Sequence, residues 1–142
     1  MTHGRAATSN IPPHFDSEGD DRAAIEMQLA TYTHAVSTKN QALFETLLLN
    51  KTIPFSSVPT TDLEIGTGIS NYEAFRKGVF EGAPFTQTFK NVRIEQDGKL
   101  AAVALVFVNT RPEGESWGWK ALQLLKVSGT WKIASEFYTS HK

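Results

Sequence analysis

Two short turn sequences in the second half of the chain limit most strongly what it can fold into. Asp97-Gly98 and Ser128-Gly129 each separate two long runs rich in β-forming residues, and 112–115 separates a further pair. Asp-Gly between such runs is a strong hairpin signal, because glycine tolerates the positive φ of tight hairpin turns. The pattern predicts an antiparallel meander with strands over 85–95, 99–111, 116–127 and 130–139.

The first half of the chain carries helical patterns instead. Ile25, Leu29, Tyr32 and Val36 fall on one narrow stripe of a helical wheel. Helices followed by a meander define an α+β fold, in which the helices cover one face of the sheet. The predicted elements of this half are a helix over 20–38, a short helix over 41–49, strands over 53–58 and 63–68, and a helix over 71–80 that begins at a Ser70-x-x-Glu73 capping box.

Composition places the chain among ordinary globular domains. It has 142 residues, of which 40% are hydrophobic, and it has no cysteine, so one core must form without disulfides. A net charge of −1 gives no electrostatic case for nucleic-acid binding. Without a long apolar run or a leader-like start, we expect no membrane segment and a cytoplasmic location. Residues 1–18 predict a flexible arm before a single domain over 19–142.

Strand parity divides the predicted sheet into two faces. One face is almost wholly apolar and should contact the helices; its members are Val92, Ile94, Val103, Leu105, Phe107, Leu122, Leu124, Trp131, Ile133 and Phe137. The other face includes Phe89, Trp117, Trp119, Glu136 and Tyr138, and is too apolar for open water. We therefore expect a homodimer through this outer face, including Trp117, Trp119 and Tyr138. The alternative is that residues 1–18 fold back over it.

The order of these elements, with the segments LATYTHAVSTKNQALFETLL and GTWKIASE, resembles the nuclear transport factor 2-like superfamily. The nearest branches are the SnoaL-like and ketosteroid-isomerase-like ones, and the resemblance covers about residues 20–139. It implies a cone-shaped fold with a pocket between a concave sheet and the helices, commonly in homodimers. Because the superfamily includes isomerases, cyclases, dehydratases and epoxide hydrolases beside binding modules, fold alone does not assign a reaction.

The resemblance also implies where ketosteroid-isomerase groups would lie. Tyr32 aligns with the tyrosine that donates a hydrogen bond to the oxyanion in that branch. Ser56 stands at the position of its aspartate base, and its second oxyanion donor falls near Leu122 or Gln123. A serine cannot abstract a carbon-bound proton at neutral pH, so we reject steroid isomerisation as the leading interpretation.

Lys120 is the unusual residue of the predicted apolar face, where Lys90 lies as well. Lys120 could bind an anion or become a desolvated nucleophile, or its stem could pack while the ammonium reaches water. Tyr32 could donate into a pocket or be a core aromatic residue. Glu136 is expected on the outer face, in ion pairs. The histidines and carboxylates have no metal-ligand spacing, and we predict no cofactor.

These observations predict a homodimeric protein with a hydrophobic pocket for a small, mostly apolar ligand. Two alternatives stay open. One is an isomerase, cyclase or dehydratase acting on a small apolar or polyketide-like substrate, with Tyr32 and Lys120 as catalytic candidates. The other is a dimerisation module without a pocket. The predicted pocket lining is Tyr32, Ser56, Tyr72, Phe75, Phe107, Asn109, Lys120 and Phe137.

Overall fold

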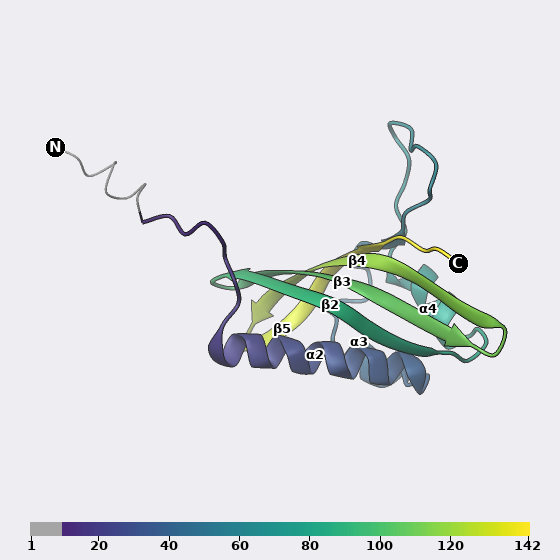
Figure 1. The fold of residues 1–142 in the computed structure, drawn as a ribbon, viewed down its shortest axis with the longest axis horizontal. Coiled ribbons are helices and arrows are strands. Elements are labelled where there is room, and N and C mark those ends of the chain that lie inside the picture. Colours follow the sequence, from purple (N-terminus) through teal and green to yellow (C-terminus); the bar gives the residue numbers. More distant parts are fainter. Residues whose placement is uncertain (1–9) are drawn as a thin grey trace.

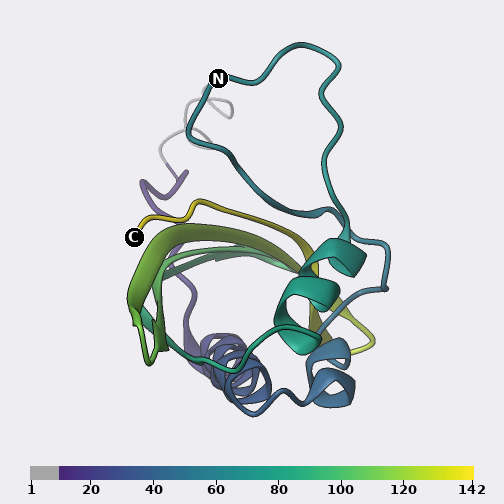
Figure 2. The same cartoon turned by 90° about the vertical axis from the view of Figure 1, so that its right-hand side faces the viewer.

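A computed structural model describes residues 10–142, in which a curved five-stranded sheet wraps around three helices (Figures 1 and 2). The strand order is β1-β5-β4-β3-β2; β2 to β5 form the expected antiparallel meander, and β1 joins β5 in parallel. The α+β prediction is therefore confirmed. The elements are α2 (Gly19–Ser37), α3 (Gln41–Glu45), β1 (Phe55–Ser57), α4 (Tyr72–Phe80), β2 (Thr86–Asp97), β3 (Leu100–Arg111), β4 (Gly114–Val127) and β5 (Thr130–Tyr138).

The helices pack as their patterns predict, with differences at the ends. The α2 stripe of Ile25, Leu29, Tyr32 and Val36 is buried. The α3 helix ends at Glu45 rather than at residue 49, because the chain that follows it pairs with the middle of β5. The α4 helix begins one residue later than predicted. The side chain of Asn71, not of Ser70, caps this helix by accepting a hydrogen bond from the Glu73 amide at 3.0 Å.

The strand predicted over 63–68 is wrong. These residues belong to a loop between β1 and α4 that projects from the body of the molecule (Figure 2). A bridge between Pro54 and Asn71 occupies the sheet margin beside β1, so the loop has no strand to pair with. Its apolar side chains consequently stay in solvent, and Ile65 is fully exposed.

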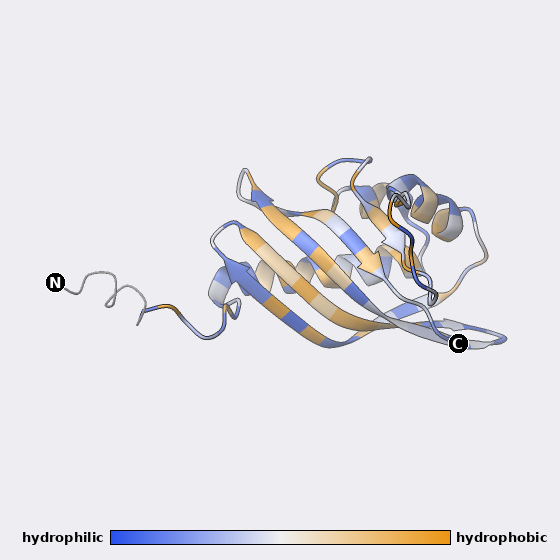
Figure 3. Cartoon of the chain, turned by 90° about the horizontal axis from the view of Figure 1, so that it is seen from above, coloured by the Kyte–Doolittle hydropathy of each residue, from blue (hydrophilic) through white to orange (hydrophobic). Residues whose placement is uncertain are grey.

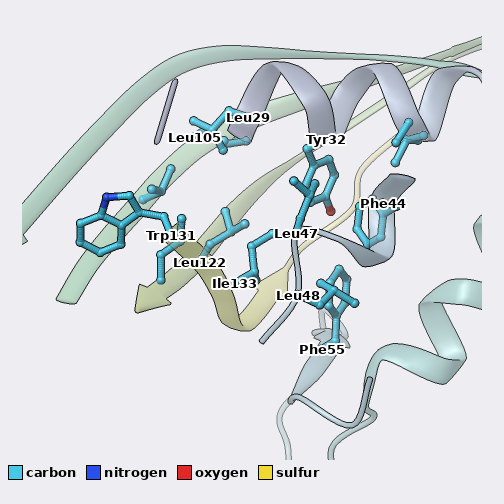
Figure 4. Close-up of a cluster of buried hydrophobic side chains, with 14 of the residues drawn as sticks. Leu29, Tyr32, Phe44, Leu47, Leu48, Phe55, Leu105, Leu122, Trp131 and Ile133 are labelled. Carbon is cyan, nitrogen blue, oxygen red and sulfur yellow. The ribbon is translucent and has the colours of Figure 1, made fainter. Parts of the chain in front are cut away.

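A bulge in β5 changes which side chains face the helices. Gln123 pairs with Ser135 and Leu124 pairs with Ile133, so Ala134 is an extra residue in the ladder. Before the bulge the predicted parity holds, and Trp131 is 1% exposed in the core (Figure 4). After the bulge the parity is reversed.

Three face predictions are wrong for this reason. Glu136 is 0% exposed and lies inside, and Tyr138 also faces the interior. Phe137 lies on the outer face, where it contributes to a groove with Arg93 and Trp119. Tyr138 therefore does not belong to the outer-face surface that we expected it to share with the tryptophans.

A second bulge lies in β2, between Lys90 and Arg93, where Asn91 has a φ of 53°. It corrects two further predictions. Phe89 pairs with Phe107 and lies inside, with its ring centroid 5.2 Å from that of Tyr32. Lys90 is exposed and pairs with Val106, so it does not lie on the inner face.

Part of the predicted N-terminal arm is tied to the sheet. The amide of Ser17 donates to the carbonyl of Ile94 at 3.0 Å, and the amide of Gln96 donates to the carbonyl of Phe15 at 2.6 Å. The rest of that prediction, residues 1–9, lies outside the described residues. Within 10–142, every helix is too short or too polar to cross a bilayer.

Candidate functional site

A lysine, a glutamate and a tyrosine meet on the inner side of the curved sheet. Lys120 Nζ donates to Glu136 Oε2 at 2.9 Å and to the Tyr32 hydroxyl at 2.6 Å. That hydroxyl donates to Glu136 Oε1 at 2.8 Å. Lys120 is only 1% exposed, so this is a buried and fully connected polar cluster rather than a surface ion pair.

Three separate elements build this cluster. Tyr32 comes from the buried stripe of α2, Lys120 from the middle of β4, and Glu136 from β5. Glu136 faces inward only because the bulge at Ala134 reverses the parity of β5. The cluster is thus a product of the sheet irregularity as well as of the helix pattern.

Burial controls the electrostatics of the cluster. It lowers the pKa of Lys120 and raises the pKa of Glu136, while the attraction between the two charges opposes both shifts. Burial and the neighbouring Glu136 carboxylate raise the pKa of Tyr32 well above its ordinary value, so this hydroxyl keeps its proton. Burial also raises the pKa of Tyr138, to about 12.

Aromatic rings surround the lysine ammonium. Its Nζ lies 4.6 Å from the ring centroid of Tyr32, 5.0 Å from that of Phe107 and 5.1 Å from that of Tyr138. Phe75 and Phe89 complete this ring cage at 5.7 and 5.8 Å. The faces of aromatic rings are electron-rich, so the cage stabilises the positive charge of this largely buried side chain.

A cavity of about 200 Å³ opens beside this cage, between α4 and the sheet. In its wall, Gln87 donates from Nε2 to Asn109 Oδ1 at 2.9 Å. The other amide atom, Gln87 Oε1, is buried and has no hydrogen-bond partner among the described residues. The residues that line the cavity are Ala74, Phe75, Gly78, Val79, Phe85, Gln87, Phe107, Asn109, Arg111, Lys120 and Tyr138.

Positive charge marks the mouth of the cavity. Arg111 lies over the ring of Phe85, with its Cζ 4.4 Å from the centroid, and Lys39 Nζ lies 5.6 Å from the same centroid. Lys39 donates to the carbonyl of Val79. Within residues 10–142, no carboxylate forms an ion pair with Arg111 or Lys39. The mouth can therefore accept an anionic group.

One glycine makes room for the cavity wall. Gly118 pairs with Phe107 across β3 and β4. A Cβ at this position would overlap the carbonyl oxygen of Thr139 and lie 2.7 Å from Phe107 Cε1. The absence of a side chain lets the Phe107 ring lie against the backbone of β4.

The structure brings together four of the eight predicted lining residues, Phe75, Phe107, Asn109 and Lys120. Tyr32 lies behind them, against Lys120. Ser56 and Tyr72 lie elsewhere: Ser56 donates to the carbonyl of Ser57, and Tyr72 donates to Glu45 Oε2 at 3.0 Å. Phe137 is on the opposite face. Leu122, at the position compared with an oxyanion donor, is a core residue.

Among the polar and ionisable residues of this region, sequence reasoning missed four, which are Gln87, Arg111, Glu136 and Tyr138. Glu136 and Tyr138 were assigned to the wrong face because a bulge is not visible in the alternation of residue types. A weak signal existed for Gln87 and Arg111. They are polar residues at strand ends that lie on the same face as an apolar run.

The outer face of the sheet carries a separate and larger groove. Its volume is about 560 Å³, and its lining includes three alanines together with Arg93, Glu95, Trp119 and Phe137. Figure 3 views the sheet from above, and hydrophobic and hydrophilic residues alternate along its strands. Trp119 is 53% exposed there, and Trp117 is also exposed.

Comparison with known proteins supports the fold. No protein-family model and no curated protein sequence matches the chain. A protein of unknown function with a cystatin-like fold from Nostoc punctiforme has a TM-score of 0.69 at 12% identity, covering 89% of this chain and 95% of its own. A nuclear transport factor 2-like protein of unknown function from Shewanella baltica has a TM-score of 0.64 at 16% identity, covering 89% and 99%.

A third solved structure carries a reaction name. It is a provisionally named scytalone dehydratase from Novosphingobium aromaticivorans, with a TM-score of 0.65 at 16% identity over 86% of this chain and 85% of its own. Likeness at such identities establishes architecture only. The chain has the nuclear transport factor 2-like fold, in agreement with the resemblance noted in its sequence.

Proposed function

We propose that this protein binds a small carboxylate with an apolar, preferably aromatic, body in the cavity beside Lys120, and that it does so as a homodimer. The observation that carries the binding proposal is Gln87 Oε1. It is an acceptor on a side chain only 6% exposed, in the wall of a cavity, without a partner among the described residues. Buried polar atoms are almost always hydrogen-bonded, so a ligand donor is a natural partner for this oxygen.

The cavity wall indicates the chemistry of the ligand. Phe75, Phe107 and Tyr138 offer ring surfaces to an apolar body. The guanidinium of Arg111 offers paired donors to a carboxylate at the mouth. The volume of about 200 Å³ lies below the roughly 300–1,000 Å³ of sites for drug-sized ligands. A hydroxybenzoate has the required size, with a carboxylate for Arg111 and a hydroxyl donor for Gln87.

Titration calorimetry with 4-hydroxybenzoate tests this proposal. We expect saturable binding with one ligand per chain. Gln87→Leu removes the unpartnered acceptor and should weaken binding by about threefold to tenfold, the value of a hydrogen bond between neutral groups. Arg111→Met removes the charge but keeps a stem, and it should weaken binding by about tenfold or more, the value of a hydrogen bond to a charged group. The matched controls are Gln41→Leu on α3 and Arg22→Met on α2, neither of which lines the cavity or the groove of the outer face.

Two results would count against the cavity as a ligand site. One is the absence of saturable binding to the wild-type protein at millimolar ligand. The other is binding that Arg22→Met weakens as much as Arg111→Met does. The presence of a lined cavity favours a binding role over a dimerisation module without a pocket.

The homodimer proposal rests on the outer face. Trp117 and Trp119 are large exposed aromatic residues on one sheet face, and such residues are typical anchors of subunit interfaces. Arg93 and Glu95 line the same groove, which makes its charges self-complementary. In a two-fold dimer the arginine of one copy can meet the glutamate of the other, because each patch contacts itself.

Sedimentation at micromolar concentration tests the dimer. We expect the mass of two chains for the wild-type protein and of one chain for Trp119→Glu. Ile65→Glu introduces the same charge on the fully exposed loop and should leave the dimer intact. A wild-type monomer would contradict this part of the proposal without affecting the cavity.

A further inference from the structure

Lys120 occupies a position that a purely structural ion pair does not require. Five aromatic rings surround its Nζ. Three of them, those of Phe75, Phe107 and Tyr138, line the cavity, as Lys120 itself does. The amine therefore lies at the inner end of the cavity wall. Two of its N–H groups are used by Tyr32 and Glu136, and the third has no hydrogen-bond partner among residues 10–142.

Charge is distributed unevenly along the cavity. At the inner end, the positive charge of Lys120 is balanced by Glu136 at 2.9 Å. At the mouth, Arg111 has no paired carboxylate within residues 10–142. A ligand carboxylate is consequently attracted to the mouth and repelled from the Glu136 end. The inner end is left for a neutral group that can react with or accept from an amine.

The distance between the two ends limits the ligand. Lys120 pairs with Leu105, which lies six residues before Arg111 on β3, or roughly 20 Å at about 3.3 Å per residue. Both side chains shorten the span that a ligand must cover, because Lys120 Nζ lies 5.0 Å from the ring of Phe107, two residues closer to Arg111, and the arginine side chain extends from the other end. A molecule with a carboxylate at one end and a carbonyl group across a single ring or a short chain has the appropriate length.

We propose that Lys120 is a nucleophile that forms a reversible imine with a small oxo acid, whose carboxylate is held by Arg111 and whose carbonyl carbon lies at Nζ. This inference rests on the binding proposal above and deepens it by naming the ligand class. It also gives Glu136 and Tyr32 separate roles in the reaction.

The reaction balances with the groups present. The Lys120 ammonium first gives a proton to Glu136. The amine attacks the carbonyl carbon, forming the C–N bond, while the carbonyl oxygen takes the proton from Glu136. The attached nitrogen then returns one proton to the Glu136 carboxylate. Finally Glu136 protonates the new hydroxyl, which leaves as water, and the product is a protonated imine beside a Glu136 carboxylate.

The residues around Lys120 favour both the first step and the product of this reaction. Burial lowers the pKa of Lys120 and raises that of Glu136, and both shifts favour the first proton transfer. The product is again a cation 2.9 Å from a carboxylate position and inside a ring cage, so no new charge is buried. Tyr32 keeps its proton and is a positioning residue, because its hydroxyl fixes the orientation of both Lys120 and Glu136.

The test is reductive trapping with 4-formylbenzoate and cyanoborohydride at pH 7, followed by peptide mass spectrometry. We expect one adduct per chain at Lys120, formed with saturation kinetics, whereas an exposed lysine such as Lys51 reacts slowly and in proportion to concentration. An excess of 4-hydroxybenzoate, which cannot form an imine, should protect Lys120 and leave Lys51 unchanged.

Variants assign the individual roles. Lys120→Met should abolish the saturable adduct. Glu136→Gln should slow it by about 100-fold, at the lower end of what a general acid–base contributes, and should remove its pH dependence. The matched Glu26→Gln on the exposed side of α2 should leave the rate unchanged. Arg111→Met keeps the cluster intact and should raise the concentration needed for half-saturation by about tenfold.

The outcomes separate this inference from the binding proposal. If 4-hydroxybenzoate binds but Lys120 is trapped no faster than Lys51, the imine inference is overturned and the binding site stands. If neither compound binds, both are overturned. Because the protection experiment and Arg111→Met leave the buried cluster in place, the test does not depend on Lys120→Met or Glu136→Gln being folded.

Discussion

The two halves of β5 face the same interior but build different surroundings. Before Ala134, Trp131 and Ile133 pack into the apolar core. After Ala134, Glu136 and Tyr138 face an ammonium group and a cavity. One bulged residue separates a dry, closed end from a polar, open end. Stability should therefore depend mainly on the half of β5 before Ala134, and ligand binding mainly on the half after it.

The largest loss of stability is expected for a substitution in the closed end. Trp131→Ala should lower the free energy of unfolding by about 3–5 kcal/mol, because it empties a large buried volume. Urea denaturation measures this loss. Ile65→Ala on the exposed loop is the control and should change the free energy by less than about 0.5 kcal/mol. Equal effects of the two substitutions would contradict the assignment of the core.

The next largest loss of stability is expected for a substitution in the open end. Lys120→Met leaves Glu136 buried without its partner and should lower the free energy of unfolding by about 3 kcal/mol at pH 7. Burial then raises the pKa of Glu136 in the folded state. A raised folded-state pKa gives stability that is complete below the ordinary glutamate value of about 4.3 and is lost as the pH rises. The variant should therefore be more stable at pH 4.5 than at pH 8.

A double variant sharpens the same prediction. Adding Glu136→Gln to Lys120→Met removes the unpaired charge, so it should recover most of the lost free energy at pH 8. Urea denaturation at both pH values gives the four numbers that are needed. A double variant as unstable as Lys120→Met alone would show that packing, and not charge, holds the open end together.

A smaller loss of stability is expected for a substitution in β4, the strand that pairs with β5. Gly118→Ala should lower the free energy of unfolding by about 1–3 kcal/mol, because its Cβ meets the Thr139 carbonyl and the Phe107 ring. Gly78→Ala on α4 should have the opposite sign, a gain of about 0.5–1 kcal/mol, because its Cβ meets nothing and alanine favours a helix. Thermal unfolding of both variants checks the two signs.

The smallest effect concerns a polar contact at the closed end. Hydrogen bonds from Lys126, then from Gln96 and Trp131, lower the pKa of Asp21 to about 2. A lowered folded-state pKa gives stability that is present above the ordinary aspartate value and is lost as the pH falls towards 2. Asp21→Asn should therefore flatten the dependence of stability on pH between about 4 and 2. An unchanged slope in acid denaturation would remove Asp21 from this role.

The fold was largely predictable because its signals are local. The α2 stripe and the turns at Asp97-Gly98 and Ser128-Gly129 act within a few residues, and they specify a helix and two hairpins. The parallel pairing of β1 with β5 was not predicted. The two strands lie far apart in the sequence, and a three-residue strand is too short to show a pattern that indicates its partner. The strand predicted over 63–68 was wrong because alternation alone does not supply a partner.

The site was predictable only in part because it depends on irregularities. Lys120, Phe107 and Asn109 precede the bulge in sequence and follow strand parity, so they were placed correctly. Glu136, Phe137 and Tyr138 follow Ala134 and were placed on the wrong faces. A bulge is stabilised by the packing of the whole sheet, and the residue types around Ala134 do not announce it.

The backbone contact of Phe15 and Ser17 with β2 has a consequence for how the chain behaves when shortened. A free outer strand presents unpaired amides and carbonyls that invite pairing with another molecule. The segment around Asp16 covers part of that border, as β1 covers the opposite one. Removing residues up to 18 would expose the backbone of β2 as an edge strand, which can then pair with a strand of another molecule. We therefore expect an N-terminally truncated chain to aggregate more readily than the longer one.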